Sequence, residues 1–208
     1  MKTTKQHSNY WINRKIDWEK DYFDTWTHPH RGLIVHMLKG MPGGNVWEVG
    51  VGGGANIYRI INDIPTFKSE FRVGGSDINP EAIEFCRKKF GGGQWHCESG
   101  DNMMMSDHSV DILLTDMTLI YVDPLKIDSY LREFKRILRP NGYVLLVEFD
   151  SKSWWKRQVA RWGGYHVYNY QKRLEKLGFY SIMVQKIPPQ YWEADNNTEF
   201  RSIITAKV

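Results

Sequence analysis

The sequence predicts an α/β protein built on a mainly parallel β-sheet, and three observations lead to this fold class. Short apolar runs alternate along the chain with segments whose apolar residues recur at helical spacing. The first apolar run ends in a glycine-rich turn that leads straight into a helical pattern. The last two apolar runs are joined across Pro188-Pro189, which favours an antiparallel pair at the end of the chain.

Each expected β-strand is an apolar run bounded by turn-forming residues. In chain order the runs cover residues 45–49, 71–76, 94–98, 110–115, 143–149, 180–187 and 200–207. A helical pattern lies between most neighbouring runs, and such an alternation is typical of parallel strands joined by crossover helices.

The expected helices carry their apolar residues on one face and have recognisable start and stop signals. In chain order they cover residues 33–38, 54–64, 79–90, 123–138 and 170–177. Asn79 is expected to cap the third of them, because a capping side chain followed by a proline and an acid favours a helix start. Asp123-Pro124 is expected to open the fourth, which Pro140-Asn141-Gly142 ends.

Composition limits the class of protein. The chain has 208 residues with 41% hydrophobic and 25% charged residues, which is typical of a globular domain with one core. No apolar run approaches the roughly 20 residues that span a bilayer, and the N-terminus is polar, so we expect no membrane partner and no secretory signal. Two cysteines do not make a disulfide framework, which favours a cytoplasmic location. The net charge of +4 does not by itself indicate a nucleic-acid partner.

The residues with the clearest chemical meaning lie in the stretch from Glu48 to Gly54, Glu-Val-Gly-Val-Gly-Gly-Gly. Glycines let the backbone bend sharply and let a ligand approach, and the following helix presents free N–H groups to an anionic group. A tight turn without a ligand is the alternative. Asp77, at the end of the second expected strand, is suited to accept both hydroxyls of a ribose or to cap a helix. Glu48, at a buried strand end, requires a cationic ligand group or a hydrogen bond to the loop.

The pattern Glu48-x-Gly50-x-Gly52-x-Gly54, followed by Asp77, resembles the cofactor signature of class I S-adenosylmethionine-dependent methyltransferases. Residues 100–102, 110–116 and 138–145 are similar to later parts of that family's pattern. The resemblance implies a Rossmann-like three-layer sandwich whose sheet has seven mostly parallel strands, the last one antiparallel. It also implies S-adenosylmethionine as the cofactor. The residues expected to bind it are Arg31, Glu48, Gly50, Gly52, Gly54, Asn56, Asp77, Ile78, Asp101, Asn102, Asp116 and Met117.

Residues 26–31, Trp-Thr-His-Pro-His-Arg, are similar to the N-terminal region of small-molecule methyltransferases in which this region closes over the cofactor. We therefore expect residues 1–40 to form a helical lid, with Arg31 paired to the cofactor carboxylate. Residues 41–208 would form the cofactor-binding domain, with an aromatic, basic insertion at about 151–176. The step of 27 residues from Gly50 to Asp77 is longer than the family pattern, which predicts a small insertion in or after the first helix of that domain.

The same glycines allow a second interpretation. Gly50-x-Gly52-x-x-Ala55 satisfies the fingerprint of nicotinamide-dinucleotide oxidoreductases, with an acid downstream for the ribose. That fingerprint does not require Glu48, and no second substrate domain follows it.

The sequence lacks the motifs that mark several classes of methyl acceptor. Residues 115–119, Thr-Asp-Met-Thr-Leu, lack the Asp/Asn-Pro-Pro-aromatic motif of adenine methylation, and neither Cys86 nor Cys97 lies in a Pro-Cys context for cytosine chemistry. No metal is expected, because His96, Cys97 and His108 do not have zinc-ligand spacing.

Two segments outside the common pattern are rich in aromatic residues, residues 1–31 and 151–176. The second contains seven Lys or Arg and one acid, Glu175, which is a surplus of +6 (7 − 1). It is expected to cover a hydrophobic pocket, to bind an anionic small substrate, or to hold RNA by stacking and phosphate contacts.

The sequence therefore predicts a methyltransferase that acts on an O or N atom of a small molecule, a metabolite or sugar derivative. The alternatives are an RNA methyltransferase, a nicotinamide-dependent oxidoreductase and a nucleotide-binding domain without activity. Asp116, Tyr121 and His166 are the candidate general bases by position. The residues expected to contact the substrate are Tyr22, Trp26, Tyr121, Trp154, Tyr165 and His166.

Overall fold

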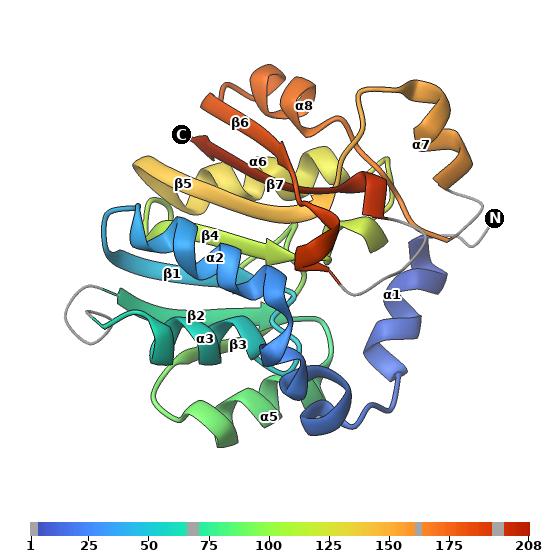
Figure 1. Cartoon of the computed structure of the whole chain (residues 1–208). Helices are drawn as coiled ribbons and strands as arrows, with labels where there is room; N and C mark the ends of the chain where they lie inside the picture. Colours follow the sequence, from blue (N-terminus) through green and yellow to red (C-terminus); the bar gives the residue numbers. More distant parts are fainter. Residues whose placement is uncertain (1–3, 66–70, 161–163, 193–197) are drawn as a thin grey trace.

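A seven-stranded sheet with helices on both faces forms the body of the protein (Figure 1). The computed structural model describes residues 4–65, 71–160, 164–192 and 198–208. The strands are β1 (Gly44–Val49), β2 (Phe71–Asp77), β3 (Gln94–Cys97), β4 (Val110–Asp116), β5 (Leu138–Phe149), β6 (Tyr180–Lys186) and β7 (Arg201–Lys207). Their order is β3-β2-β1-β4-β5-β7-β6, and only β7 runs antiparallel to its neighbours. The predicted fold class is confirmed.

The helices divide between the two faces of the sheet. Helices α2 (Pro29–Lys39), α3 (Ala55–Asp63) and α5 (Pro80–Phe90) share one hydrophobic cluster with the sheet, and α6 (Ile127–Ile137) and α8 (Tyr170–Lys176) share the other. The remaining elements lie beyond the strand ends: α1 (Thr4–Asn13), the π-helix η1 (Trp18–Tyr22), the 3-10 turns η2 (Phe23–Thr27), η3 (Leu119–Tyr121), η5 (Pro189–Tyr191) and η6 (Thr198–Phe200), and α7 (Trp154–Ala160).

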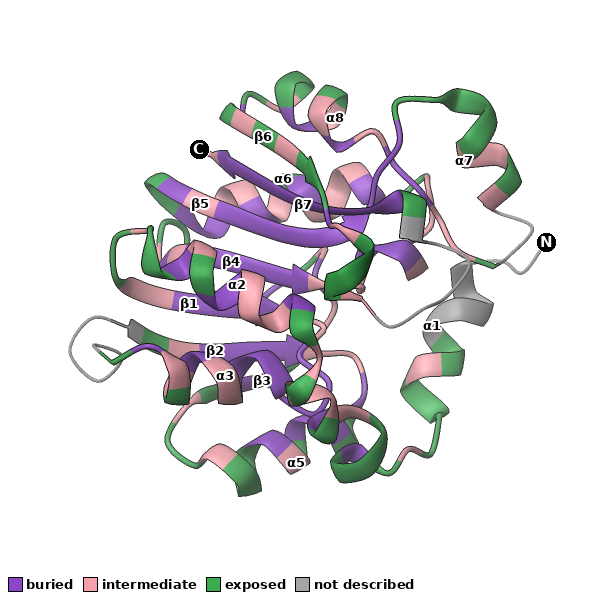
Figure 2. Cartoon of the chain, viewed as in Figure 1, coloured by how far each residue is buried: buried purple, intermediate pink, exposed green. Residues whose placement is uncertain are grey.

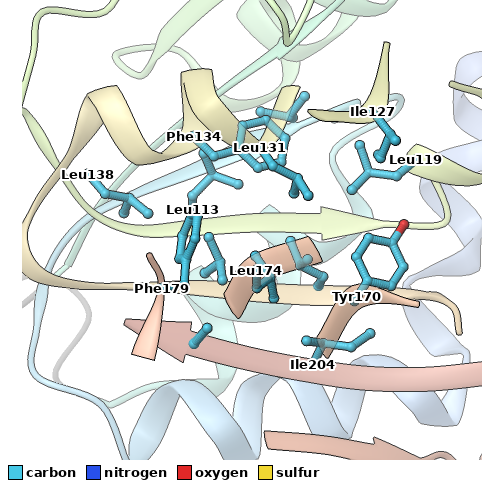
Figure 3. Packing of buried hydrophobic residues seen from close by; sticks show 14 of the residues in the cluster. Leu113, Leu119, Ile127, Leu131, Phe134, Leu138, Tyr170, Leu174, Phe179 and Ile204 are labelled. Carbon is cyan, nitrogen blue, oxygen red and sulfur yellow. The ribbon is translucent and has the colours of Figure 1, made fainter. Parts of the chain in front are cut away.

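The central strands are buried on both sides because successive side chains enter opposite clusters. On β4, Leu113 points to the α6 side, while Ile112 and Leu114 point to the α3 side. Figure 3 shows the cluster on the α6 side, which includes Leu113, Phe134 of α6 and Tyr170 of α8. The central strands β1, β4, β5 and β7 are the most continuously buried part of the chain (Figure 2). The sheet is therefore a fixed platform, and its strand ends carry the site.

Some element boundaries differ from the sequence prediction. The Asn79 cap is confirmed, since its Oδ1 accepts a hydrogen bond of 2.8 Å from the Glu81 N–H. Asp123-Pro124 does not open α6, which begins at Ile127. Oδ1 of Asp123 instead accepts a hydrogen bond from the Leu125 N–H in a turn, a local interaction that aspartate often makes. The α6 helix ends at Ile137, before Pro140-Asn141-Gly142, and these three residues lie inside β5. An insertion was expected in or after the helix that follows Gly50; the α3–β2 connection spans residues 64–70, of which 66–70 lie outside the described residues.

Candidate functional site

A cavity of about 430 Å³ lies at the carboxyl ends of β1, β2 and β4. This is where the strand order reverses direction, between β1 and β4, and open parallel sheets bind their ligands at such a point. The volume lies in the range of small-molecule pockets. The cavity is lined by the glycine loop, the ends of β2 and β4, the N-terminal segment and Trp192.

The glycine loop needs glycine at specific positions. Gly50, Gly52 and Gly54 have φ of +74°, +52° and +74°, the left-handed region that side chains with a Cβ seldom adopt. A Cβ at Gly50 would lie 2.2 Å from Oγ1 of Thr118. The loop is tied to β2, since the N–H groups of Gly50 and Val51 both donate to the Ser76 carbonyl. Gly50, Gly52 and Gly53 line the cavity, and Gly54 packs on Phe90 instead.

A buried polar network closes the inner end of the cavity. Nδ2 of Asn56, on α3, donates to Oε1 of Glu48 at 2.8 Å and to Oδ2 of Asp116 at 3.0 Å. The same Oδ2 accepts from Arg31 Nη1 at 2.7 Å and from His30 Nε2 at 3.1 Å. Asn56 therefore joins an acid of β1 to an acid of β4 across the switch point.

The two acids differ in protonation. Burial raises the pKa of Glu48 to about 8, against the lowering effect of the Asn56 hydrogen bond. Burial also acts on Asp116, but the charges of His30 and Arg31 and the hydrogen bonds from His30 and Asn56 hold its pKa well below the usual range. Asp116 is ionised and compensated, whereas Glu48 is a carboxyl group that lacks a cation.

Three buried acceptor oxygens in this network have no hydrogen-bond partner among the described residues: Oε2 of Glu48, Oδ1 of Asn56 and Oδ1 of Asp116. Buried polar atoms without partners are costly, and several on one cavity indicate a missing ligand. An ammonium group, with three donors and a positive charge, matches them. The α-amino group of S-adenosylmethionine is such a group. Trp18 adds a buried Nε1–H donor without a partner to the same cavity.

Asp77 lies at the end of β2, on the opposite side of the glycine loop. Its Oδ2 accepts from the Gly52 N–H at 3.1 Å and its Oδ1 from the Asn79 N–H at 2.9 Å. These bonds orient the carboxylate and leave each oxygen a lone pair for ribose hydroxyls. Beyond it, Ile78, Ser99 and Glu98 line the cavity, and Oε1 of Glu98 is another buried acceptor without a hydrogen-bond partner in the described parts of the chain. This end fits an adenosine.

The N-terminal segment forms the roof over the glycine loop. Trp18 and Phe23 are buried, and Phe23 packs on Tyr58 of α3 with ring centroids 5.1 Å apart. A Cβ on Gly53 would lie 2.7 Å from the Trp18 carbonyl oxygen and 2.8 Å from the Phe23 nitrogen. The Asn79 side chain also donates to the Trp11 carbonyl at 2.8 Å. The roof is thus packed directly on the backbone that is expected to hold the cofactor.

Aromatic rings surround the remaining part of the cavity. Tyr121, on η3, meets the ring of Trp11 edge-on with centroids 4.8 Å apart. The rings of Trp192 and His30 pack together with their centroids 3.9 Å apart, so that the β6–β7 connection contacts α2. Tyr22 joins these rings in the cavity wall.

The structure brings most of the predicted site residues together. Those that line the cavity are Tyr22, Arg31, Glu48, Gly50, Gly52, Asn56, Asp77, Ile78, Asp116, Met117 and Tyr121. Arg31 is paired inside the protein, with Asp116 and with Thr25, rather than held free for a cofactor carboxylate.

The other predicted residues lie elsewhere. Asp101 accepts a hydrogen bond from the Ser99 hydroxyl, and neither it nor the exposed Asn102 lines the cavity. Trp26 packs on Tyr58 at 5.2 Å. In the insertion, Trp154 stacks on Trp155 in solvent, Tyr165 packs between Phe149 and Tyr121, and the His166 N–H donates to the Ile120 carbonyl. None of these four side chains (Trp26, Trp154, Tyr165, His166) lines the cavity.

Several cavity residues had no role expected from the sequence, among them Trp11, Trp18, His30, Glu98, Thr118 and Trp192. His30 and Trp18 lie in segments already expected to cover the site, so the sequence could have indicated that they line it. Nothing in the sequence indicated a site role for Trp192, because the β6–β7 connection reaches α2 only through the antiparallel insertion of β7.

Comparisons with known proteins agree with this geometry. Residues 47–146 match the family described as methyltransferase domain. A 63-residue stretch is 35% identical to the ubiquinone/menaquinone biosynthesis C-methyltransferase UbiE of Rubrivivax gelatinosus; it covers 30% of this chain and about a quarter (24%) of that protein.

Two solved structures share the fold over nearly the whole chain. One is an S-adenosylmethionine-dependent methyltransferase of Thermotoga maritima, a possible histamine N-methyltransferase (TM-score 0.64, 18% identity, 91% of this chain and 96% of that chain). The other is the geranyl diphosphate C-methyltransferase of Streptomyces coelicolor, with Mg²⁺, geranyl diphosphate and S-adenosylhomocysteine (TM-score 0.69, 12% identity, 98% and 97%). Residues 47–146 of this chain therefore match a methyltransferase domain, and the chain has the fold of the class I S-adenosylmethionine-dependent methyltransferases.

Proposed function

We propose that this protein transfers the methyl group of S-adenosylmethionine to an O or N atom of a small molecule. The observation that carries the proposal is the set of unpartnered acceptor oxygens of Glu48, Asn56 and Asp116 beside the glycine loop. S-adenosylmethionine has an ammonium group for these atoms. A nicotinamide dinucleotide has none, and would leave Glu48 buried without a cation.

The chain's own residues divide the cofactor between two ends of the cavity. Glu48, Asn56 and Asp116 would hold the amino-acid part, and Asp77 would hold the ribose. Ile78 and Glu98 would contact the adenine, by packing and by accepting from its amino group. When bound, the cofactor supplies a methyl group on a positively charged sulfur. The protein's task is to hold an acceptor in line with that methyl group and to exclude water.

The walls of the cavity favour a small acceptor with an apolar or aromatic body. Cofactor and acceptor share a cavity of about 430 Å³, and the roof of Trp11, Trp18 and Tyr22 covers it. A flexible polymer such as RNA would need an open groove in place of this roof. The Thermotoga relative is described as a possible N-methyltransferase, which is consistent with a nitrogen acceptor.

His30 is the side chain best placed to take a proton from the acceptor. Because Asp116 is ionised and accepts only, Nε2 of His30 carries the hydrogen in their 3.1 Å contact. When the ring is neutral, Nδ1 is then the nitrogen that can accept a proton. Of the three bases expected from the sequence, Asp116 is held at low pKa, burial keeps the Tyr121 phenol protonated, and His166 does not line the cavity.

Titration calorimetry tests the cofactor assignment. S-adenosylhomocysteine is expected to bind at one site, and NAD⁺ and NADH are expected not to bind. Binding of NADH without binding of S-adenosylhomocysteine would overturn the proposal in favour of an oxidoreductase.

The acceptor class is tested separately, with S-adenosylmethionine labelled in its methyl group. Panels of small phenols, small amines and single-stranded RNA are incubated with the protein, and the labelled product is identified by mass spectrometry. Label on a phenol oxygen or an amine nitrogen supports the proposal; label on RNA or on carbon overturns the acceptor assignment but leaves the cofactor assignment in place.

A further inference from the structure

The α7 helix turns its apolar side to solvent. Trp154 and Trp155 are 61% and 68% exposed and Val159 is 47% exposed, whereas Ala160 packs against the cluster of Ile120 and Phe149. Amphipathic helices of folded proteins bury the apolar face instead. Figure 2 shows the exposed stretch along α7 at the edge of the molecule.

The orientation of α7 is fixed by its polar side. Nη1 of Arg157 donates to the carbonyl oxygens of Ser151 and Lys152, both at 2.8 Å, which ties the helix to the chain that leaves β5. Arg157 and Ala160 therefore face the body, and Trp155 and Val159, four positions apart, share the opposite side. Trp154 lies between these two sides and is exposed as well. The two indoles stack on each other, with centroids 5.5 Å apart and planes at 23°. Exposed apolar clusters of this kind mark an interaction surface.

Two exposed lysines, Lys152 and Lys156, lie next to this surface. With Lys186 they line a second cavity, of about 280 Å³, at the start of α7, and the Lys186 Nζ is tied inside the protein to the carbonyl oxygens of Asp150 and Phe200 and to Oγ of Ser202. Asp150 and Glu199 also line it, so the cavity carries a net charge of +1 (3 − 2), and exposed Lys172 of α8 adds another positive charge to this part of the chain. Of the two acids that line this cavity, Glu199 forms an ion pair with Lys156 among the described residues.

We propose that this surface, α7 with Lys152, Lys156 and the second cavity, docks on an anionic lipid membrane, in contrast to the expectation from the sequence that the protein has no membrane partner. Tryptophan prefers the interface between headgroups and acyl chains, and lysines around an apolar helix face attract anionic headgroups. A platform for RNA would need aromatic faces spaced along a basic groove, whereas here the two indoles stack on each other and the exposed apolar surface continues into aliphatic Val159.

The position of α7 gives such docking a consequence. It follows the carboxyl end of β5 directly, and therefore lies at the same edge of the sheet as the candidate site (Figure 1). No helix among the described residues is suited to span a bilayer. The inferred contact is with the membrane surface, which would place the cavity's edge of the molecule next to the lipid.

Vesicle sedimentation with the full chain tests the proposal, independently of any methyl transfer. Vesicles of 30% phosphatidylglycerol in phosphatidylcholine are expected to bind the protein at least tenfold more tightly than pure phosphatidylcholine. The Trp154→Ser/Trp155→Ser protein is expected to lose at least tenfold in partitioning, and the Lys152→Glu and Lys156→Glu proteins about fivefold or more each. Met104→Ser and Lys88→Glu, which change an exposed methionine and an exposed lysine on other elements, are expected to have no effect.

Three results would overturn the proposal. One is equal binding of wild type and the double tryptophan variant to anionic vesicles. Another is no vesicle binding but salt-dependent binding of a single-stranded oligouridine that the lysine variants lose, which would assign the surface to nucleic acid. The third is no vesicle binding but a dimer, seen by analytical ultracentrifugation, that the tryptophan variant dissociates. Circular dichroism and the thermal midpoint confirm that each variant is folded.

Discussion

The carboxyl group of Glu48 is held on one side only: Oε1 accepts a hydrogen bond of 2.8 Å from Nδ2 of Asn56, and Oε2 is buried without a partner among the described residues. The amide orients the acid toward the cavity, and burial raises its pKa to about 8. A buried carboxyl group without a cationic partner is stabilised most strongly by a cationic ligand, because the ligand supplies the positive charge that no protein side chain provides beside it.

Glu48 should therefore make cofactor binding depend on pH. Below pH 8 the free protein carries a proton on Glu48, and an ammonium group displaces it, so the association constant of S-adenosylhomocysteine should rise up to about tenfold per pH unit toward pH 8 and then level off. Calorimetry in two buffers of different ionisation enthalpy should show proton release at pH 7. Glu48→Gln should remove both the release and the pH dependence; persistence of both would assign the proton to another group.

The same group sets a stability trend in the cofactor-free protein. Its folded-state pKa, about 8, lies above the ordinary value of 4.5, so its stabilising contribution is full below about pH 4.5 and is lost as the pH rises through 8. Glu48→Gln protein should lose less of its free energy of unfolding between pH 6 and pH 9 than the wild type. Urea denaturation at these two pH values measures the difference, and equal losses in both proteins would contradict it.

Asp77 should contribute to affinity through its charge. Asp77→Asn keeps the size of the side chain but removes the carboxylate that two ribose hydroxyls would share, which should weaken S-adenosylhomocysteine binding by about 2 kcal/mol, or roughly thirtyfold. Asp107→Asn, the same change at an exposed position, is the control. Because Asp77 also accepts from the Gly52 N–H, the thermal midpoint is measured alongside. A folded Asp77→Asn protein with unchanged affinity would exclude the ribose role.

Gly53 offers a test of the N-terminal roof that leaves the chain intact. An alanine there would press on the backbone of Trp18 and Phe23, so the roof must shift, at a cost of about 1–3 kcal/mol. We expect a thermal midpoint lower by roughly 3–10 °C and weaker cofactor binding. Gly92→Ala is matched to it, because nothing lies within 4 Å of its Cβ position. If both variants behave alike, the roof is not packed on the loop.

Truncation separates the parts of the predicted lid, residues 1–40. Deletion of residues 1–13 removes α1 and the Trp11 contacts with Asn79 and Tyr121, and should weaken cofactor binding while the protein stays folded. Deletion of residues 1–26 also removes the buried rings of Trp18 and Phe23, and should lower the thermal midpoint by more than 5 °C. Full cofactor affinity after the shorter deletion would contradict a closing role for α1.

The tautomer of His30 can be observed directly. In protein labelled with ¹⁵N-histidine, two-bond proton–nitrogen spectra at pH 8 should show a hydrogen on Nε2 and a bare Nδ1 for the ring that is missing from the His30→Asn spectrum. Exposed His36, on the same helix, is the reference. A hydrogen on Nδ1 of His30 would exclude it as the base. A large loss of S-adenosylhomocysteine affinity in His30→Asn would instead assign the ring to the cofactor.

The sequence by itself determined the architecture and the cofactor end of the site. The alternation of apolar runs predicts the sheet, and the spacing from Glu48 to Gly54 predicts the loop, because both follow from local geometry: strand burial, left-handed φ and the helix start at the loop. Asp77 and Asn56 are placed by that same short segment and its neighbouring strand. The structure confirms that these residues face one cavity.

Only the tertiary structure decided which residues from distant segments complete the site. Sequence spacing contains no information on the meeting of His30 with Asp116, which are 86 positions apart, or of Trp192 with His30. It also cannot show that Trp154 and Trp155 of α7 face solvent or that His166 lies away from the cavity, since an aromatic residue has the same identity whether it packs a core, lines a pocket or faces solvent. Those outcomes depend on how β7 inserts between β5 and β6 and how the N-terminal segment folds back over the glycine loop.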